Sequence, residues 1–518
     1  MNNKYLLALD CGTQSVRALV FDLRGNLLDR ARIPVQPYFC PAPGRAEQNA
    51  EYLWQSLCQA CQGVWDQGRT KPEQIQGIAL TCQRASLVPL DEEGTPLRPL
   101  VSWLDQRLAR DLPQLPRNKH MLLRLSQLIP TVRHFQARAL DNWLAENEPH
   151  IWSRTQKYLL LSGYLHFRLC GEYKDSTACQ VGYLPFDYPR QNWLPRKHWK
   201  WHLFRVRPWQ LPRLLPPGHI LGNIQPQASQ ETGLPQGLPI VAAAADKACE
   251  VLGAGCIHNQ QACLGLGTTA TINVCSNRYK TPKPLLPAYP AAVPGMYNLE
   301  IQNFRGFWLV SWFKHQFGHQ EMQQAEHRNM SPEEILNLML DQTQPGSLGL
   351  MVQPFWTPGL RSPGPEAKGS ILGFGDVHSR AHVYRALLEG LAYALLQGKL
   401  DIEKRLGQDI ETLVAAGGGA RSDQVLQLLA DVFGQEVHRP HTFEASGLGA
   451  AINLARGLGF YPDFSSAIQS MTRTEPGFIP NKRNHRLYKA LFSRVYQKLY
   501  PRLRHLYQEL REITGYPE

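Results

Sequence analysis

Two turns rich in glycine and threonine carry groups that could hold a phosphate. The first, Gly12-Thr13-Gln14-Ser15, follows an apolar strand-like run that ends at Asp10, and Arg17 lies just beyond it. The second, Gly267-Thr268-Thr269, lies between two similar apolar segments. A glycine turn lets backbone N–H groups approach an anion closely, and hydroxyl groups add donors. We therefore expect both turns to surround one phosphate chain, through Thr13, Gln14, Ser15 and Arg17 on one side and Gly267 and Thr268 on the other.

Two carboxylates follow apolar segments that look like buried strands. Asp10 is well placed to hold a magnesium ion, directly or through water, that bridges phosphate oxygens. Asp246 follows the apolar run 238–245 and precedes a helical segment, so the helix N-terminus favours its charge. Such a carboxylate can point into a cleft from a rigid mount; the plainer interpretation is a simple helix N-cap.

A third glycine cluster, Gly417-Gly418-Gly419, lies between the apolar strand 413–416 and a helix that contains Val425 and Val432. Three glycines at a strand-to-helix junction allow a flat ligand to lie against the backbone, and a permissive helix entry would not need three of them. The phosphate-loop pattern GxxxxGK[ST] does not occur in the sequence.

A polar set in the first part of the chain suits a small polyhydroxylated ligand. It consists of Gln83 and Arg84, which follow the apolar strand 77–80, and of Trp103, Asp105 and Arg107. Such a ligand needs several hydrogen bonds and a flat apolar face. Each of these residues taken alone is more often structural.

The strand, turn and strand around Gly12 are echoed about 255 residues later around Gly267, which indicates two related lobes. Strand-like and helix-like segments alternate throughout, so the fold class is α/β. We place the boundary just before the strand 238–245, which gives an N-terminal lobe of residues 1–237 and a C-terminal lobe of residues 238–518.

The composition indicates an ordinary globular protein. The chain has 518 residues, of which 43% are hydrophobic and 19% charged, with 39 Pro and 41 Gly. These values exclude a disordered tail, a coiled coil and a collagen-like fibre. No apolar run approaches the roughly 18–20 residues of a spanning helix, and no signal peptide precedes the first strand. We expect a cytoplasmic protein without a membrane partner.

The eleven cysteines all lie in the first 275 residues, scattered within apolar segments. This distribution is typical of reduced, buried thiols. Cys58 and Cys61 have CxxC spacing, but no second pair accompanies them and the surrounding pattern is helical, so we do not assign them a metal or redox role.

The net charge of +12 raises the question of nucleic acid. Residues 189–213 interleave seven basic residues with four tryptophans, a pattern that could stack bases. Residues 482–511 have leucines and a valine at three- or four-residue spacing, which predicts an amphipathic terminal helix that Pro501 kinks or divides. We favour a connector for the first stretch and a solvated face for the second over a nucleic-acid partner.

Taken together, these motifs resemble the FGGY carbohydrate kinases. The pattern Asp10-x-Gly12-Thr13-x-Ser15-x-Arg17 resembles the first phosphate motif of that family, and Trp103-x-Asp105-x-Arg107 its sugar-contacting segment. Gly267-Thr268 resembles the second phosphate motif of the family, and residues 417–420 resemble its adenosine motif. Two further segments, 385–390 and 444–451, look like structural signatures of the second lobe. The order and spacing of these motifs are specific, and they cover most of the chain.

The resemblance implies a two-lobed actin-like ATPase fold with a cleft between the lobes, and transfer of the ATP γ-phosphoryl group to a hydroxyl of a small sugar or polyol. It places the catalytic base at Asp246 and magnesium at Asp10. The residues that it assigns to ATP are Thr13, Gln14, Ser15, Arg17, Gly267, Thr268, Gly306, Gly418, Gly419 and Asp423. The residues that we expect to bind the acceptor are Gln83, Arg84, Trp103, Asp105, Phe135, Asp246 and Lys247. A homodimer is the habit of the family.

Two departures from the family bear on the acceptor. Glycerol kinases have Gln-Arg-Glu where this chain has Gln83-Arg84-Ala85, and the Gln-Met-His of xylulokinases is also absent. We therefore favour a ketose such as a pentulose over glycerol. Lys247 stands where Gln, Asn or Gly is common, and we expect it to contact the substrate or to help keep Asp246 ionised.

Two other functions compete with the kinase. The first is a catalytically silent sugar or nucleotide sensor on the same fold, which would have no need of a base such as Asp246. Substrate-dependent ADP release separates it from a kinase. The second is a nucleic-acid binder that uses residues 189–213, which a gel shift abolished only by high salt would support.

Overall fold

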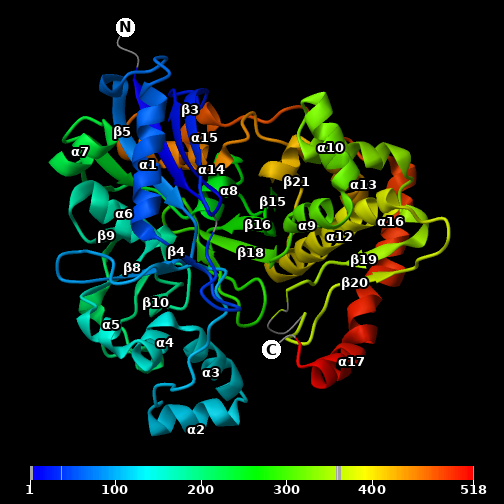
Figure 1. Cartoon of the computed structure of the whole chain (residues 1–518), viewed down its shortest axis with the longest axis horizontal. Coiled ribbons are helices and arrows are strands. Elements are labelled where there is room, and N and C mark those ends of the chain that lie inside the picture. Colours follow the sequence, from blue (N-terminus) through cyan, green and yellow to red (C-terminus); the bar gives the residue numbers. More distant parts are fainter. Residues whose placement is uncertain (1–3, 37, 358, 360–362, 517–518) are drawn as a thin grey trace.

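Two six-stranded sheets form the centre of the molecule (Figure 1). The structure is a computed structural model that describes residues 4–36, 38–357, 359 and 363–516. In spatial order the first sheet contains β13 (Ile220–Asn223), β14 (Pro239–Ala242), β5 (Ile75–Cys82), β1 (Tyr5–Cys11), β2 (Ser15–Phe21) and β3 (Leu27–Pro34). The second contains β17 (Tyr289–Pro290), β18 (Tyr297–Asn303), β16 (Ala270–Ser276), β15 (Gln261–Leu266), β21 (Thr412–Ala416) and β22 (Val437–His438).

The two sheets share one plan. In the first, β1, β2 and β3 form an antiparallel meander, and β5 and β14 continue the sheet in parallel on the other side of β1. In the second, β15, β16 and β18 form the meander, and β21 and β22 continue it in parallel beside β15. The predicted repeat of strand, turn and strand and the predicted α/β class are confirmed.

The first sheet is buried on both faces, which explains why β1 is apolar at nearly every position. Leu7 and Leu9 pack into a core that contains residues of α1 (Ala50–Trp65) and α6 (Leu161–Cys170). Leu6 and Ala8, which point to the opposite face, pack with α8 (Asp246–Gly253) and α14 (Ala445–Gly457). Asp10 is the only polar residue between Tyr5 and Cys11, and it stands at the strand end.

Helix α8 is wedged between the two sheets. Ala248, Cys249 and Leu252 belong to the core of the first sheet. Val251, one turn away on the other face, packs with Cys263, Val414 and Ala416 of the second sheet. The helix therefore begins, at Asp246, where the two lobes meet.

The sheet pairing changes the lobe boundary expected from the sequence. The strand after residue 238 does not open the second lobe, because β14 pairs with β5 inside the first sheet. Helices α14 and α15 (Phe464–Met471) also return to this sheet, so residues far apart in sequence lie side by side in Figure 1. We propose that the division between the lobes falls in 254–260 and not at 237/238.

A smaller unit extends the first lobe beyond the edge of the cleft. Its four-stranded sheet has the order β4 (Glu47–Gln48), β7 (Leu100–Val101), β6 (Leu87–Leu90) and β8 (Lys157–Leu160). Its helices are α2 (Arg117–Leu125), α3 (Ile129–Arg138), α4 (Leu140–Asn147) and α5 (Pro149–Arg154). The remaining elements of this lobe are β9 (Lys174–Ser176), β10 (Phe186–Asp187), β11 (Asn192–Trp193), β12 (Arg213–Leu215) and α7 (Pro226–Thr232).

Helices surround the sheet of the second lobe, and some of them also border the cleft (Figure 1). They are α9 (Trp308–Phe317), α10 (His319–Arg328), α11 (Pro332–Asn337), α12 (Arg380–Leu406), α13 (Asp423–Phe433), α16 (Lys482–Leu491) and α17 (Gln497–Thr514), with the short strands β19 (Met351–Gln353) and β20 (Ser370–Leu372). Among the described residues, no helix combines the length and the apolar character that crossing a bilayer requires.

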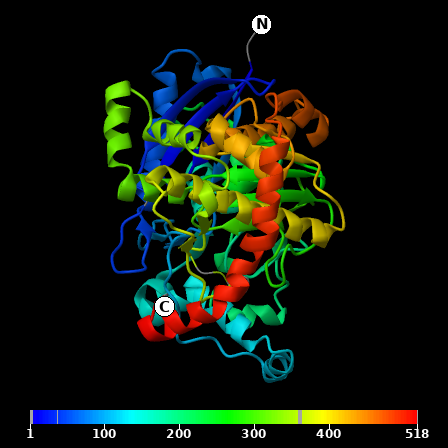
Figure 2. The same ribbon diagram turned by 90° about the vertical axis from the view of Figure 1, so that its right-hand side faces the viewer.

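The terminal helix is divided, as predicted, but the division precedes the proline. Figure 2 shows α16 and α17 as a long rod over the outer face of the second lobe. A π-helical stretch, Phe492–Tyr496, separates them, and Pro501 lies inside α17. Proline removes one backbone hydrogen bond and crowds the carbonyl four residues earlier, so a wide turn just ahead of it relieves this crowding.

A buried carboxylate fastens this rod to the lobe. Glu389 of α12 accepts hydrogen bonds from the Tyr488 hydroxyl (2.8 Å), the Gly346 N–H (2.8 Å) and the Ser347 hydroxyl (3.0 Å). Burial raises the pKa of Glu389 from 4.5 to about 7. The segment 385–390 therefore has a structural role, as its sequence suggested.

The raised pKa predicts a pH-dependent stability that Glu389→Gln removes. The folded protein binds this proton more tightly than the unfolded chain, so the associated stability is full below about pH 4.5 and is lost as the pH rises through about 7. The free energy of unfolding in urea should be measured at about pH 5 and at about pH 7.5. Between these values it should fall further for wild type than for the variant, by ~1.4 kcal/mol for each pH unit that lies between the two pKa values. Equal losses in the two proteins would contradict this.

Two glycines set the distance between α8 and α14. A Cβ added to Gly449 would lie 2.0 Å from the carbonyl oxygen of Cys249, and one added to Gly253 would lie 2.0 Å from that of Ala445. We predict that Gly449→Ala lowers the free energy of unfolding by ~1–3 kcal/mol because it forces the helices apart. Gly163→Ala in α6, whose Cβ would meet nothing closer than 3.4 Å, is the matched control. Equal effects of the two variants in denaturant unfolding would be evidence against this close helix contact.

Candidate active site

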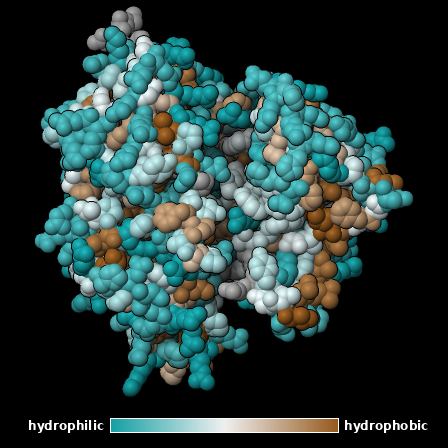
Figure 3. Space-filling model, in the orientation of Figure 1, coloured by the Kyte–Doolittle hydropathy of each residue, from teal (hydrophilic) through white to brown (hydrophobic). Residues whose placement is uncertain are grey.

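The cleft between the lobes brings together most of the residues singled out in the sequence. It is visible as a deep groove in Figure 3, and its volume is about 4090 Å³. Asp10, Thr13, Gln83, Asp246, Thr268 and Gly418 all line it. Asp246 is the first residue of α8, and its Oδ1 accepts a hydrogen bond of 2.8 Å from the backbone N–H of Lys247. The carboxylate thus has a fixed mount at the junction of the lobes.

Asp10 and Arg17 form a cross-strand ion pair. The two residues are direct partners in the register of β1 and β2, and Arg17 Nη2 lies 2.7 Å from Asp10 Oδ2. Arg17 Nη1 lies 2.5 Å from Glu444 Oε2, at the start of α14. Burial raises the pKa of Asp10 to about 6; Arg17 opposes this rise, and Asp246 and Glu444 add to it. Arg17, expected to contact a phosphate, is therefore shared between two carboxylates.

Thr13 connects the first turn to the polar set beside it. Its hydroxyl donates a hydrogen bond to Gln83 Oε1 (2.8 Å) and accepts one from the Trp103 indole N–H (3.1 Å). Gln83 in turn donates to Gln48 Oε1 (2.7 Å). Because a hydroxyl has a single proton and Thr13 donates it to Gln83, that proton is not free for a phosphate.

Asp105 supports the cleft wall from behind. Its Oδ1 accepts from the Arg107 N–H (2.9 Å) and its Oδ2 from the Ala46 N–H (2.7 Å), while the Arg107 guanidinium contacts both oxygens. Arg107 also pairs with Glu47 (2.6 Å). The expected contact of Asp105 with a ligand would need one of these bonds to break, so the geometry favours a positioning role.

Arg84 crosses the cleft. Its Nη2 lies 2.8 Å from Oε1 of Glu300 on β18, in the opposite lobe, and its guanidinium lies 5.3 Å from the ring centre of Tyr289. Burial by itself would lower the pKa of Arg84, but Glu300 and Asp246 outweigh it and raise that pKa. Phe135 on α3 also lines the cleft, with its ring 5.6 Å from that of Tyr183.

The second turn is tied to the start of α9. The Phe307 N–H donates to Gly267 O (3.0 Å) and the Trp308 N–H to Thr268 O (3.3 Å). Gly417 packs against this turn, because a Cβ there would lie 3.3 Å from the Gly267 nitrogen. A Cβ on Gly418 would meet nothing within 4 Å, whereas one on Gly419 would meet the Phe307 ring at 2.6 Å. Open space beside Gly418, next to an aromatic ring, can take a flat ligand.

Two residues assigned to ATP lie off the cleft. Gly306 is buried, and a Cβ there would lie 2.0 Å from the Ala270 nitrogen, so this glycine allows a close backbone approach and does not border the cavity. Asp423 is the first residue of α13 and pairs with Arg439 away from the cavity. Arg421 and Ser422 line the cleft in its place.

Family models match the chain in two consecutive parts. The N-terminal domain of the FGGY family of carbohydrate kinases matches residues 5–253, and the C-terminal domain of the same family matches residues 262–458. The chain belongs to the FGGY family of carbohydrate kinases. It is therefore a phosphotransferase that acts on an alcohol group and uses ATP.

Similar sequences and solved structures match this carbohydrate kinase over almost its whole length. An uncharacterised sugar kinase of Escherichia coli, YgcE, is 32% identical over 96% of this chain and 94% of its own. A xylulose kinase of Staphylococcus epidermidis is 28% identical over 99% and 100%. The solved gluconate kinase of Lactobacillus acidophilus has a TM-score of 0.81 at 20% identity and covers 98% of this chain and 100% of its own. This last likeness shows the two-lobed actin-like fold.

Two carboxylates of the kinase cleft were not predicted from the sequence: Glu300, the partner of Arg84, and Glu250, the partner of Lys247. Glu300 alternates with apolar residues along β18, on the same face as Asn298 and Gln302, and it is 2% exposed. This period of two was a usable signal for a polar, buried strand face. Glu250 follows Asp246 by one helical turn, but nothing in the sequence marks its partner.

The tryptophan-rich stretch 189–213, for which a connector was favoured over a nucleic-acid site, makes contacts within the fold. The Trp193 indole donates to Pro212 O (2.8 Å) and the Trp201 indole to Pro195 O (3.0 Å), and Trp199 packs against a small apolar core.

Cys58 and Cys61 are buried in α1, and burial raises the pKa of both thiols. No cluster of three or more metal-ligating side chains occurs in the described part of the chain.

Because the ion pair of Arg84 and Glu300 is buried between the lobes, we predict that the effects of substituting the two residues on stability are strongly coupled. Removing one partner leaves the other buried and unpaired, so Glu300→Gln and Arg84→Met should each lower the free energy of unfolding by ~3–5 kcal/mol. The double variant should lose less than the sum. If Arg84 also contacts the acceptor, the KM for the acceptor stays raised in the double variant. Additive losses in urea unfolding would show that the pair is not coupled.

Proposed function

We propose that this protein transfers the γ-phosphoryl group of ATP to a hydroxyl of a small sugar or polyol, with a ketose such as a pentulose preferred over glycerol. The observation that carries this proposal is the position of Asp246, held at the start of a wedged helix and facing the cleft that both glycine turns line. Expected contacts of the acceptor are Gln83, Arg84, Trp103 and Phe135.

The proposed step conserves atoms and charge. The acceptor O–H bond breaks and its proton passes to an oxygen of Asp246 as the new O–P bond forms. The bond between the γ-phosphorus and the bridging oxygen breaks, and ADP leaves. Phosphoryl transfer depends mainly on positioning and on stabilisation of charge. The backbone N–H groups of the second turn and the glycines near Gly418 would supply that positioning for the nucleotide.

Asp10 fits a magnesium ion that travels with the nucleotide. Its Oδ2 is buried and accepts no hydrogen bond of good geometry among the described residues, although Arg17 is near. Magnesium in such sites takes one or two protein carboxylates and completes its shell with phosphates and water. When bound, the ion would neutralise phosphate charge. Asp10 would hold it directly or through water, and Arg17 and Glu444 would keep that carboxylate in place.

The absence of a carboxylate at position 85 supports a ketose over glycerol. Ala85 lines the cleft with a left-handed backbone, φ 52°, and packs near Gly182. Curated relatives at 28% identity include a xylulose kinase and an autoinducer-2 kinase of Yersinia pseudotuberculosis. A cytoplasmic location and a homodimer remain predictions.

A panel of acceptors tests this proposal. ADP release should depend on one of a set of pentuloses, hexuloses, tetritols, pentitols or glycerol, with a pentulose among the best. Asp246→Asn should lower kcat by ~100-fold or more because the proton acceptor is lost, while calorimetry shows ATP binding retained. Substantial activity of Asp246→Asn would remove this residue from the proton transfer. Glycerol as the best acceptor would overturn the preference for a ketose.

A further inference from the structure

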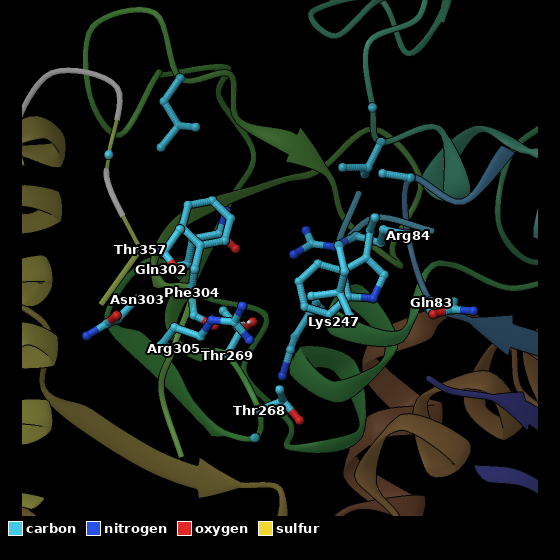
Figure 4. Close-up of a pocket in the computed structure, with 18 of the residues that line it drawn as sticks. Gln83, Arg84, Lys247, Thr268, Thr269, Gln302, Asn303, Phe304, Arg305 and Thr357 are labelled. Carbon is cyan, nitrogen blue, oxygen red and sulfur yellow. Dashed lines mark hydrogen bonds between the residues drawn. The ribbon is translucent and has the colours of Figure 1, made fainter. Parts of the chain in front are cut away.

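Lys247 lies beside the second phosphate turn, although it belongs to the helix that starts with the proposed base. Its Nζ lies 3.0 Å from Glu250 Oε1, one helical turn further on. A Cβ added to Gly265 would lie 3.1 Å from this nitrogen, and one added to Gly267 would lie 3.7 Å from it. Figure 4 shows the Lys247 side chain reaching toward Thr268 and away from Gln83.

A glycine in the middle of a strand makes room for this ion pair. Gly265 lies within β15, where glycine weakens a strand and commonly marks a close approach. A Cβ there would come within 2.4 Å of Thr271 Oγ1 and 2.5 Å of Glu250 Oε1. The pair of Lys247 and Glu250 therefore occupies the space of the missing side chain, and its place against the second sheet is fixed by packing.

The ammonium group of Lys247 stays charged at neutral pH. Burial by itself would lower the pKa of Lys247, but Glu250, Asp246 and Glu300 outweigh it and raise that pKa. An ammonium group has three donors. Glu250 accepts one of them (3.0 Å), which leaves donors for an anion at the turn.

We propose that Lys247 is a further catalytic residue, whose ammonium group binds an oxygen of the γ-phosphoryl group as it passes from ADP to the acceptor. This inference rests on the proposed kinase reaction. The lysine stands between Asp246 and the Gly267–Thr268 turn, where the transferred group must lie if the base and the turn act on one reaction. Lys247 would stabilise the charge of that group as a lysine does in phosphate loops, a motif that this chain lacks.

The position of Glu250 gives it a supporting part. It is 6% exposed, borders the cleft and accepts a hydrogen bond of 3.0 Å from the Lys247 ammonium group. By holding one donor of Lys247, it orients the ammonium group toward the turn without a large loss of side-chain entropy at the moment of binding. Glu250 is thus a positioning residue.

Nucleotide binding tests the proposal without an acceptor. Calorimetry should show that Lys247→Gln weakens the binding of a non-hydrolysable ATP analogue by ~10-fold or more, because a charge-assisted contact is lost, and that of ADP by less than about threefold. Lys404→Gln, which removes the same charge from the exposed surface of α12 outside the cleft, is the matched control and should change neither. An unchanged preference for the ATP analogue over ADP in Lys247→Gln would overturn the proposal.

Kinetics with the best acceptor of the panel separate this role from an acceptor contact. Lys247→Gln should lower kcat by ~100-fold with little change in the KM of the acceptor, and Lys247→Arg should restore part of kcat. A raised acceptor KM at unchanged kcat would instead make Lys247 an acceptor ligand. Gly265→Ala keeps the charge but displaces the pair, and should reduce the preference for the ATP analogue in the same direction. The binding experiment stands even if Asp246→Asn shows that the proposed base is wrong.

Discussion

The packing of α8 between the two sheets is the constraint on which the rest of the cleft depends. One face of this helix belongs to the core of the first sheet and the other to the core of the second. Gly253 and Gly449 let α14 approach it at backbone contact. A relative movement of the lobes must therefore pivot close to this helix, because moving its start would open two cores. This packing fixes the position of Asp246 relative to both sheets.

The charged side chains at the cleft floor are paired, and two of the three basic ones have partners on other elements. Arg17 joins β2 to β1 and α14, Arg84 joins the first lobe to β18, and Lys247 pairs within α8 against β15. Withdrawing a charge from water is costly unless a partner compensates it. The pairs of Arg17 and Arg84 therefore hold different elements in one arrangement, and a side chain that looks like a free ligand in the sequence is already engaged. Lys247 differs, because its partner leaves donors directed at a phosphate turn.

Local signals in the sequence were enough for the elements that carry the site. The apolar runs before Asp10, Asp246 and Gly417 predicted β1, β14 and β21, and the helix after position 245 begins where expected. What failed depended on pairing between distant segments. We propose a later boundary than the expected 237/238 because the partner of β14 is β5, about 160 residues earlier. Gly306 proved to be a packing glycine, because its contact with Ala270 crosses from one loop to another strand.

The two similar sheets carry opposite charges where their equivalent strands β1 and β15 end, and this difference makes the two sides of the cleft chemically distinct. The end of β1 presents a buried carboxylate, Asp10, which favours a cation. The end of β15 and the turn after it have glycines at 265 and 267 and no acid, and α8 places the ammonium group of Lys247 beside them. A nucleotide that carries its metal ion would meet the carboxylate of one repeat and the donors of the other. Two copies of one hairpin, differing by a charge, can thus orient a phosphate chain toward the single carboxylate at the start of α8.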